Sequence, residues 1–561
     1  MGGFSGFFAI KPGALAERHT RSIRKMTARM IRRGPDAGRI IEDPHHRIML
    51  GFRRLRIIDL SDAAMQPFVH KPTGSMLVFN GELYNFREIR AVLVSHGIRF
   101  TAQSDTEVIA EALAFWGPEA ITQFNGMFAI AWYDAPRQLL LLARDHAGIK
   151  PLFYSIDPMS HTVAFASQYD ALCEAPWLDI HDINPQALST YLALHYFPEE
   201  SALINNTFQL RAGTYRQFDD RGASRPVTWL RYPRFAPEAT IQDPEAAVTQ
   251  ELSNAVQRQI DADVPVCTFL SGGADSAIVT ALAHAQHPDI TAFTLSSPGW
   301  WQDESERASL YAKSLGINHQ IVSIDAQDLE HAAMDALDAC TEPTGDYSMI
   351  PSTALAHYVG QKHRVVLTGD GADELFHGHA RPDSVSHNNK NAQDQETLAA
   401  FSRFAEYTGQ LDRTLRKIDL STMHASVEAR PVFLDRNLVE LSARLTYAQC
   451  TPGGVRKGLL HSMLCKLYPD IPDNKNKRDF PIPSATAWRG PMKRLGEQCL
   501  FDLPTYPLPY LEIEGIRTFW NEHQAQTHNH TWTLWALITL QHFAYRMTQS
   551  IPDFQEQEHA A

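Results

Sequence analysis

Glycine, serine and aspartate follow directly on an apolar run at Ser271–Ser276, in the order Ser-Gly-Gly-Ala-Asp-Ser. The preceding run is rich in β-forming residues, and the following one is typical of a helix. Glycine lets a backbone approach an anion closely, and a helix N-terminus points free N–H groups at it. The Ser271 and Ser276 hydroxyls can donate as well, and the Asp275 carboxylate can hold Mg²⁺ on a polyphosphate. The stretch therefore predicts a phosphate loop without the Gly-Lys-Ser/Thr of a Walker loop, and an ordinary glycine-rich turn is the alternative.

A second loop, Thr368–Phe376, is acidic and also follows an apolar run. In a doubly wound sheet, ligands bind beyond the carboxyl ends of the strands, so the two loops can converge on one nucleotide. The carboxylates of Asp370, Asp373 and Glu374 can bridge Mg²⁺ to phosphates. The alternative is an acidic turn that caps the next helix.

The first part of the chain must position its residues on strands. Short apolar runs alternate there with turn signals at 4–10, 48–52, 76–79, 127–133, 139–143 and 162–166, and helical patterns lie at 17–32, 86–96 and 106–116. Two stacked sheets with flanking helices fit this order. We therefore expect an α+β sandwich over residues 1–217, followed by a polar, proline-containing linker at 218–245.

The second part, 246–561, has a different pattern. A helix at 248–260 leads into the phosphate-loop strand, strands follow at 290–295, 319–324 and 364–367, and helices lie between them at 304–315 and 352–360. This alternation is typical of an α/β doubly wound parallel sheet with helices on both faces. Residues 380–397 are polar and are expected to be mobile, and the chain beyond 398 is expected to be mostly helical.

Composition excludes several classes of protein. The chain has 561 residues, with 51 basic against 64 acidic side chains and a net charge of −13, which disfavours nucleic acid as the main partner. No apolar stretch is long enough to span a membrane, and the N-terminus lacks the pattern of a signal peptide. The six cysteines form no Cys-x-x-Cys pair, so we expect reduced thiols and a cytoplasmic protein.

The two loops together resemble asparagine synthetase of the glutamine-dependent type, and the resemblance covers nearly the whole chain. The matching motifs in the first part are similar to a class II glutamine amidotransferase domain, and they are Arg33-Gly-Pro-Asp36, Arg54-Leu-Arg-Ile-Ile-Asp59, Asn80-Gly-Glu-Leu-Tyr-Asn85, Ser104-Asp105, Phe124-Asn-Gly-Met-Phe128 and Arg144–Leu152. Those in the second part are Ser271–Ser276, Glu342-Pro343, Thr368–Phe376, Glu428–Asp435, Lys457 and Lys477–Pro483. The resemblance implies an Ntn-hydrolase-like sandwich joined to an ATP-pyrophosphatase-type synthetase domain.

The resemblance also implies a reaction. ATP adenylates a carboxylate, pyrophosphate leaves with the help of Mg²⁺ and lysine, and an amine attacks the acyl-adenylate. The residues implied for ATP are Leu270, Ser271, Gly272, Gly273, Asp275, Ser276, Leu295, Thr368 and Gly369, with Asp275 and Asp373 on Mg²⁺. Lys457 is expected to face the pyrophosphate, Asp370 to lie near the substrate amine, and Lys477 to be catalytic, with a solvated basic surface as the alternative for Lys477.

Position 2 departs from the family. Family members open with Met-Cys-Gly, and the cysteine exposed by removal of methionine attacks the glutamine amide. Here residue 2 is glycine, and the first cysteine is Cys173. The other residues implied for the glutamine pocket are present, namely Arg54 for the carboxylate, Asp105 for the ammonium, Asn80 and Gly81 for the oxyanion hole, and Glu82. We therefore expect a vestigial pocket without glutaminase activity, and we expect Gly2→Cys to restore some hydrolysis.

Three functions remain open at this point. The first is an ATP-dependent amide ligase that joins a small carboxylic acid to ammonia or an amine. The second is an intramolecular cyclase similar to β-lactam synthetases or lasso-peptide cyclases, although β-lactam synthetases have a tyrosine where this chain has Asp370. The third is a catalytically dead scaffold, which the intact synthetase loops disfavour. The expected partners are the small substrates and a second copy of the chain in a homodimer, with no nucleic acid and no membrane.

Overall fold

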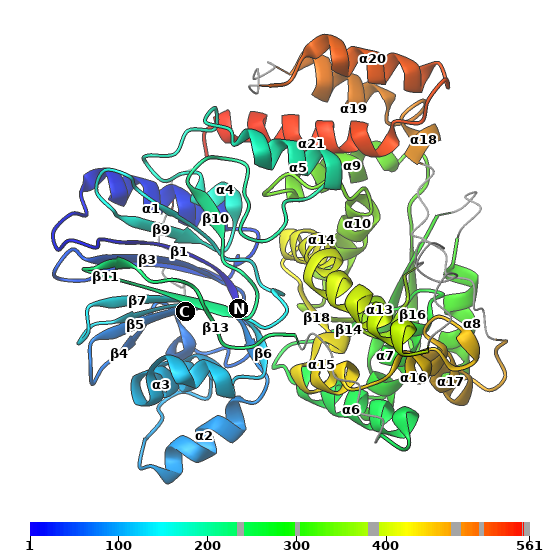
Figure 1. The fold of residues 1–561 in the computed structure, drawn as a ribbon, viewed down its shortest axis with the longest axis horizontal. Coiled ribbons are helices and arrows are strands. Elements are labelled where there is room, and N and C mark those ends of the chain that lie inside the picture. The colour runs from blue at the N-terminus through cyan, green and yellow to red at the C-terminus, as the bar shows by residue number, and fades with distance from the viewer. Residues whose placement is uncertain are drawn as a thin grey trace.

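The computed structural model describes residues 1–232, 241–297, 303–379, 392–472, 484–503, 510–551 and 554. Two lobes lie side by side, and a helical layer runs along one edge of both (Figure 1). The strands of the first lobe are β1 Gly2–Phe8, β2 Ala37–Glu42, β3 Ile48–Arg54, β4 Phe68–His70, β5 Ser75–Leu83, β6 Gly126–Asp134, β7 Leu139–Arg144, β8 Phe153–Ile156, β9 Val163–Ala166, β10 Thr207–Gln209, β11 Thr214–Asp219, β12 Gly222–Ala223 and β13 Val227–Thr228. Its helices are α1 Glu17–Arg29, α2 Phe86–Ser95, α3 Asp105–Trp116, α4 Tyr169–Leu172 and α5 Pro185–Leu194.

These strands form two antiparallel sheets that pack face to face. One has the order β10-β8-β9-β1-β3-β2, and the other has the order β12-β11-β7-β6-β5-β4, with β13 paired to β11. Alternation in β1 shows why the sheets stack. Phe4 and Phe8 point into the core between the sheets, whereas Phe7 points to the outer face, where α1 packs. Helices α2 and α3 cover the outer face of the second sheet. The predicted α+β sandwich is confirmed.

The end of this lobe lies close to the predicted linker. Strand β11 runs through residue 217, and β12 and β13 pair with it inside the predicted linker at 218–245. Residues 233–240 of that linker lie outside the described residues. Strands β2 and β8 were not predicted, and each pairs with the next strand along the chain, β3 and β9 respectively.

The second lobe is built on a parallel sheet of order β16-β15-β14-β17-β18. Its strands are β14 Val266–Phe269, β15 Thr291–Ser296, β16 Asn318–Ser323, β17 Val365–Thr368 and β18 Glu428–Pro431. The strands β14 and β17 are short apolar runs, as expected for a sheet buried beneath helices. The predicted parallel sheet is confirmed. Strand β18 was not predicted, because two charged residues and a proline hide it, and it lies at the sheet edge, where proline is tolerated.

Helices surround this sheet and continue to the C-terminal side. They are α6 Pro244–Gln259, α7 Ala274–Gln286, α8 Ser305–Leu315, α9 Leu329–Ala339, α10 Met349–Gly360, α11 Ala372–Phe376, α13 Ala392–Ala405, α14 Leu411–His424, α15 Arg436–Ala443, α16 Tyr447–Cys450, α17 Gly458–Leu467, α18 Ser484–Ala487, α19 Lys493–Glu497, α20 Ile513–Gln524 and α21 Thr531–Thr548. Helix α13 begins at Ala392, so residues 392–397 are helical where a mobile segment is predicted, and residues 380–391 lie outside the described residues.

Helix α21 belongs to both lobes. Its residues Leu540 and Phe543 join the core under the outer face of the first sheet, and Trp535 joins the core of the C-terminal helices. The Tyr191 hydroxyl of α5 donates to the Ala536 carbonyl at 2.9 Å. Figure 1 shows α21 lying along α5 on one side and below α20 on the other. Within the described part of the chain, no helix is long and apolar enough to cross a membrane.

Candidate active site

The two predicted loops meet at one edge of the parallel sheet. Strands β14 and β17 are hydrogen-bonded neighbours, so the loops that follow them leave the sheet at the same carboxyl edge. A β-carbon at Gly369 would lie 2.9 Å from the Asp275 β-carbon and 2.9 Å from the Ser276 nitrogen. Any residue other than glycine would therefore push the two loops apart. The convergence predicted from the sequence is present.

Lys457 joins the two loops through their aspartates. Its Nζ lies 2.7 Å from Asp275 Oδ2 and 2.8 Å from Asp373 Oδ1. Burial favours the neutral amine, but the two carboxylates outweigh it and raise the pKa of Lys457 well above its ordinary value. Both carboxylates thus face one buried cation, which Lys457 supplies from the N-terminus of α17. Three residues from distant segments form a compact charged centre.

The phosphate loop is held in shape by its own serines. Ser276 Oγ accepts a hydrogen bond from the Ser271 N–H at 2.9 Å, and Ser271 Oγ accepts one from the Gly273 N–H at 3.1 Å. The Gly272 N–H donates to Glu304 Oε2 at 3.2 Å. The loop at the start of α7 therefore already presents a donor to an anionic group, as a helix N-terminus does for phosphate.

The residues implied for AMP lie around the same edge. Leu270 is buried, and its N–H donates to the Phe293 carbonyl of β15 at 2.8 Å. Leu295 is half-buried near the carboxyl end of β15, and Thr368 is buried at the end of β17. The Thr368 hydroxyl makes no hydrogen bond within the described part of the chain. Their contact with a nucleotide remains a prediction.

Two further catalytic predictions differ in outcome. Asp370 lies in the acidic loop, and its Oδ1 is 3.7 Å from Lys417 Nζ on α14. Lys477 lies outside the described residues, so its place relative to the loops is a prediction only. Sequence reasoning missed Glu304 and Lys417, because each reaches the site from a segment that carries no motif of its own.

The predicted glutamine pocket is in the first lobe. Arg54, Glu82 and Asp105 line a cavity of about 10 Å³, which is space for about one water molecule. Asn80 and Gly81 lie nearby on β5 but do not line it. The Arg54 guanidinium donates to the carbonyls of Ser61 and Asp59, at 2.8 and 2.6 Å. In this arrangement the Arg54 guanidinium is already hydrogen-bonded to the loop that follows β3. Glutamine does not fit the cavity unless the lining residues move.

Gly2 has a backbone that side chains rarely adopt. Its φ is +141°, and a β-carbon there would overlap the Arg53 carbonyl oxygen of the neighbouring strand β3. With Met1 attached, a cysteine at this position strains the β1–β3 pairing. Family members remove the methionine before the cysteine acts, so the rescue of hydrolysis by Gly2→Cys stays a prediction.

A buried charged cluster connects the pocket to the second lobe. Arg430 Nε donates to Glu428 Oε1 at 2.7 Å on β18, and Arg430 Nη2 lies 3.7 Å from Glu82 Oε1 on β5. All three side chains are at most 3% exposed. Burial, followed by the charges of Glu428 and Asp105, raises the pKa of Glu82 well above its ordinary value, and Arg430 partly offsets this. Glu82 thus belongs as much to the lobe interface as to the pocket.

Comparisons with known proteins agree with this two-part layout. A family model described as a glutamine amidotransferase domain matches residues 1–229, and one described as asparagine synthase matches residues 247–413 and 385–545. The chain is 27% identical to asparagine synthetase [glutamine-hydrolyzing] 1 of Bacillus subtilis, over 86% of this chain and 87% of that protein. It is 25% identical to asparagine synthetase B of Escherichia coli, over 89% and 85% of the two chains. The amidase chry2 of Gibberella zeae is 30% identical over 70% of this chain and 61% of its own length.

Proposed function

The chain belongs to the asparagine synthase family of ATP-dependent amide ligases, and we propose that it works without glutamine hydrolysis. In this proposal, it converts a small carboxylic acid to an acyl-adenylate and transfers the acyl group to ammonia or an amine. The observation that carries the proposal is the centre formed by Lys457, Asp275 and Asp373 at the carboxyl edge of the sheet. A centre of this kind suits the departure of pyrophosphate, because charge develops there in the transition state.

The residues present fit Mg²⁺, which the family generally uses with ATP. Hard carboxylate oxygens are the ligands that Mg²⁺ prefers, and Asp275 and Asp373 both approach one cation in the folded chain. In our proposal these two carboxylates hold Mg²⁺, which neutralises charge on the phosphates when it is bound. Loop N–H groups and the serine hydroxyls orient the phosphates, and Lys457 stabilises the leaving pyrophosphate.

In our proposal the first lobe does not supply ammonia from glutamine. With Met1 lining it, its pocket is too small for glutamine, and residue 2 has no thiol. The amine nucleophile therefore reaches the acyl-adenylate from solution or from the substrate itself. Asp370, in the acidic loop, is our candidate to position that amine, and Lys417 on α14 pairs with its carboxylate.

We expect no release of glutamate from glutamine above background by the protein, and some release by its Gly2→Cys variant. The physical reason is that residue 2 has no thiol to attack the glutamine amide. A coupled glutamate assay measures this, with a mock purification as the control for contaminating glutaminase. Asp105→Asn, made in both backgrounds, is the second control. Glutamate release by the protein with Gly2 that Asp105→Asn eliminates would contradict the proposal.

The nitrogen source is tested by product formation with ATP and candidate acids. We expect clearly higher rates with ammonium or an amine than with glutamine. With ammonia as the nucleophile, the rate should rise with pH, because only the unprotonated form attacks. With a bound amine, the rate should saturate at modest concentration, because binding supplies effective molarity. Glutamine as sole nitrogen source at the ammonium rate would overturn the proposal, and product formed with no donor would indicate intramolecular cyclisation.

A further inference from the structure

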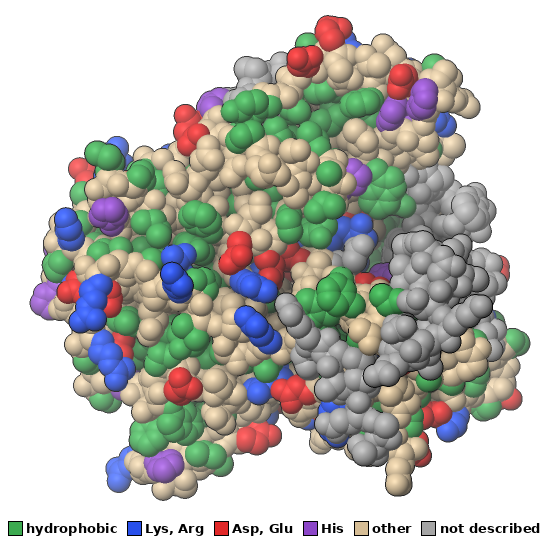
Figure 2. All heavy atoms as spheres, in the orientation of Figure 1, with side chains coloured by type: hydrophobic (Ala, Val, Ile, Leu, Met, Phe, Trp, Pro, Cys, Tyr) green, Lys and Arg blue, Asp and Glu red, His purple; other side chains and the backbone are tan. Residues whose placement is uncertain are grey.

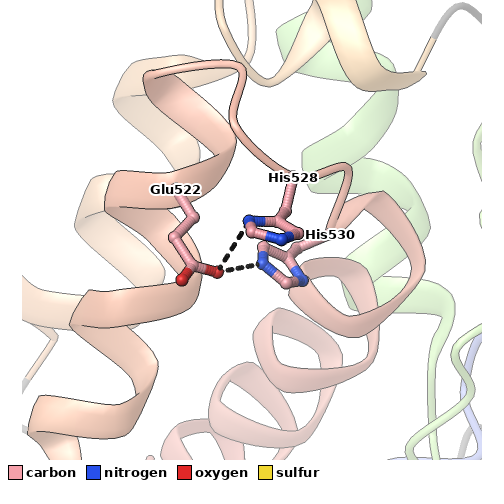
Figure 3. Close-up of side chains that lie close together, drawn as sticks. All are labelled: Glu522, His528 and His530. Carbon is pink, nitrogen blue, oxygen red and sulfur yellow. Dashed lines mark hydrogen bonds and ion pairs between the residues drawn. The ribbon is translucent and has the colours of Figure 1, made fainter.

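Three potential metal ligands lie together far from the phosphate loop. Glu522 on α20 and His528 and His530 in the turn before α21 have ligand atoms within 4.8 Å of one another (Figure 3). His530 Nε2 is 2.6 Å from Glu522 Oε2, and His528 Nδ1 is 3.7 Å from the same oxygen. Both rings thus face one carboxylate oxygen from the same side of the turn.

The turn is held from both ends, so the two histidines are preorganised. At the end of α20, Gln526 has a left-handed φ of 60°, and the Thr527 N–H donates to the Glu522 carbonyl at 3.1 Å. At the start of α21, Asn529 Oδ1 accepts hydrogen bonds from the Thr531 N–H at 3.2 Å and from its hydroxyl at 2.6 Å. Asn529 lies between the two histidines, so these bonds hold the backbone that carries both of them.

A third histidine holds the backbone of His530 and is not itself a ligand. Buried His523 accepts the His530 backbone N–H at its Nδ1, at 3.2 Å, and its Nε2 donates to the Ala485 carbonyl at 3.1 Å. The two bonds give a His523 ring that accepts through Nδ1 and donates through Nε2. The bond at Nδ1 holds the backbone from which the His530 ring extends.

From this geometry we propose that Glu522, His528 and His530 form a zinc site. Imidazole nitrogens and carboxylate oxygens are zinc ligands, and tetrahedral ligands about 2.0–2.2 Å from zinc lie roughly 3.3–3.5 Å apart. The observed separations from Glu522 Oε2 are 3.7 Å to His528 and 2.6 Å to His530. The second is a direct hydrogen bond, so zinc binding requires the His530 ring and the Glu522 carboxylate to move slightly apart. Three protein ligands leave a fourth position for water. The site is open to entry, since the side chains of His528 and Glu522 are 66% and 35% exposed.

The site clamps α20 to the beginning of α21. Its ligands come from the last turns of one helix and from the residues immediately before the other. Figure 2 shows histidine and acidic side chains gathered on the surface where α20 turns into α21, well away from the sheet of the second lobe in Figure 1. Zinc there orders the turn and takes no part in adenylation.

The test is zinc binding by the full chain, stripped of metal and dialysed against Zn²⁺ with excess Mg²⁺ to occupy the nucleotide site. We expect about one Zn²⁺ per chain, tetrahedral visible bands on Co²⁺ substitution, and slower hydrogen exchange in the α20–α21 turn. Glu522→Gln and the exposed His528→Ala should each weaken binding at least tenfold. The matched control is His46→Ala, which removes a His–Glu pair of the same 2.6 Å length from the first lobe.

The outcomes separate zinc binding from a simple ion pair. ATP–pyrophosphate exchange should be unchanged in Glu522→Gln and His528→Ala, which also shows that both variants fold. The proposal fails if wild type and Glu522→Gln bind the same amount of zinc, or if His46→Ala loses as much as His528→Ala. It fails equally if zinc binds only at millimolar concentration, because the cluster is then a His–Glu ion pair alone.

Discussion

Asp275→Asn and Asp373→Asn should each reduce ATP–pyrophosphate exchange by about 100-fold or more. Loss of groups that merely support a metal ligand costs about 10–100-fold, and these carboxylates are the proposed ligands themselves. Each substitution also removes one of the two negative charges that surround Lys457. The exchange assay with a substrate acid, which does not require the amine, isolates the adenylation step.

The matched control is Asp289→Asn, which makes the same substitution at an exposed residue beyond the far end of α7. Its exchange rate should equal that of wild type. Thermal unfolding should show that Asp275→Asn stays folded, because Lys457 keeps Asp373 as its partner. A variant that exchanges pyrophosphate within a few-fold of wild type would refute the assignment of that aspartate.

Arg430→Met should produce the largest loss of stability. Removing one partner of a buried ion pair costs about 3–5 kcal/mol, because the remaining charge is left without compensation. Here two carboxylates, Glu428 and Glu82, lose the same guanidinium, and so do the carbonyls of Gln259 and Asp261, which it bonds at 2.6 and 2.8 Å. Thermal unfolding at neutral pH should show a much lower midpoint.

The pH dependence of that loss has a definite sign. Burial, and then the charges of Glu428 and Asp105, raise the pKa of Glu82. The Glu82 carboxylate therefore binds a proton more tightly in the folded protein than in the unfolded protein. Stability from such a group is present at low pH and is lost as the pH rises through its folded pKa. The deficit of Arg430→Met should therefore shrink as the pH falls.

Arg137→Met is the control, since its pair with Asp134 is 66% exposed on the arginine side and contributes about 1 kcal/mol or less. A deficit that is constant with pH would contradict this account.

Local signals made most of the frame predictable. Strands such as β6 combine apolar residues with flanking turns, and the two glycine-containing loops can be identified from their composition. The parallel sheet then brings those loops together, because neighbouring strands β14 and β17 end at one edge.

Contacts between distant segments were beyond such reasoning. Glu304 and Lys417 approach the loops only in the folded chain, and β18 is a strand because its charges find buried partners. The obstacle to a side chain at Gly2 is likewise invisible in sequence, since the overlapping oxygen belongs to Arg53 on another strand. A motif identifies the residue types of a site, whereas steric room is decided by the neighbours.

Helix α21 has a consequence for the order in which the chain can fold during synthesis. Phe7 of β1 and Ile23 of α1 belong to one apolar core on the outer face of the first sheet. Leu540 and Phe543 of α21 complete that core, and the ribosome adds them almost a full chain length later. At typical elongation rates this interval is roughly half a minute or more. The nascent first lobe therefore exposes an uncovered apolar surface until α21 emerges. The last step of its folding therefore waits for α21, and a nascent chain stalled before α21 exposes a surface that chaperones bind.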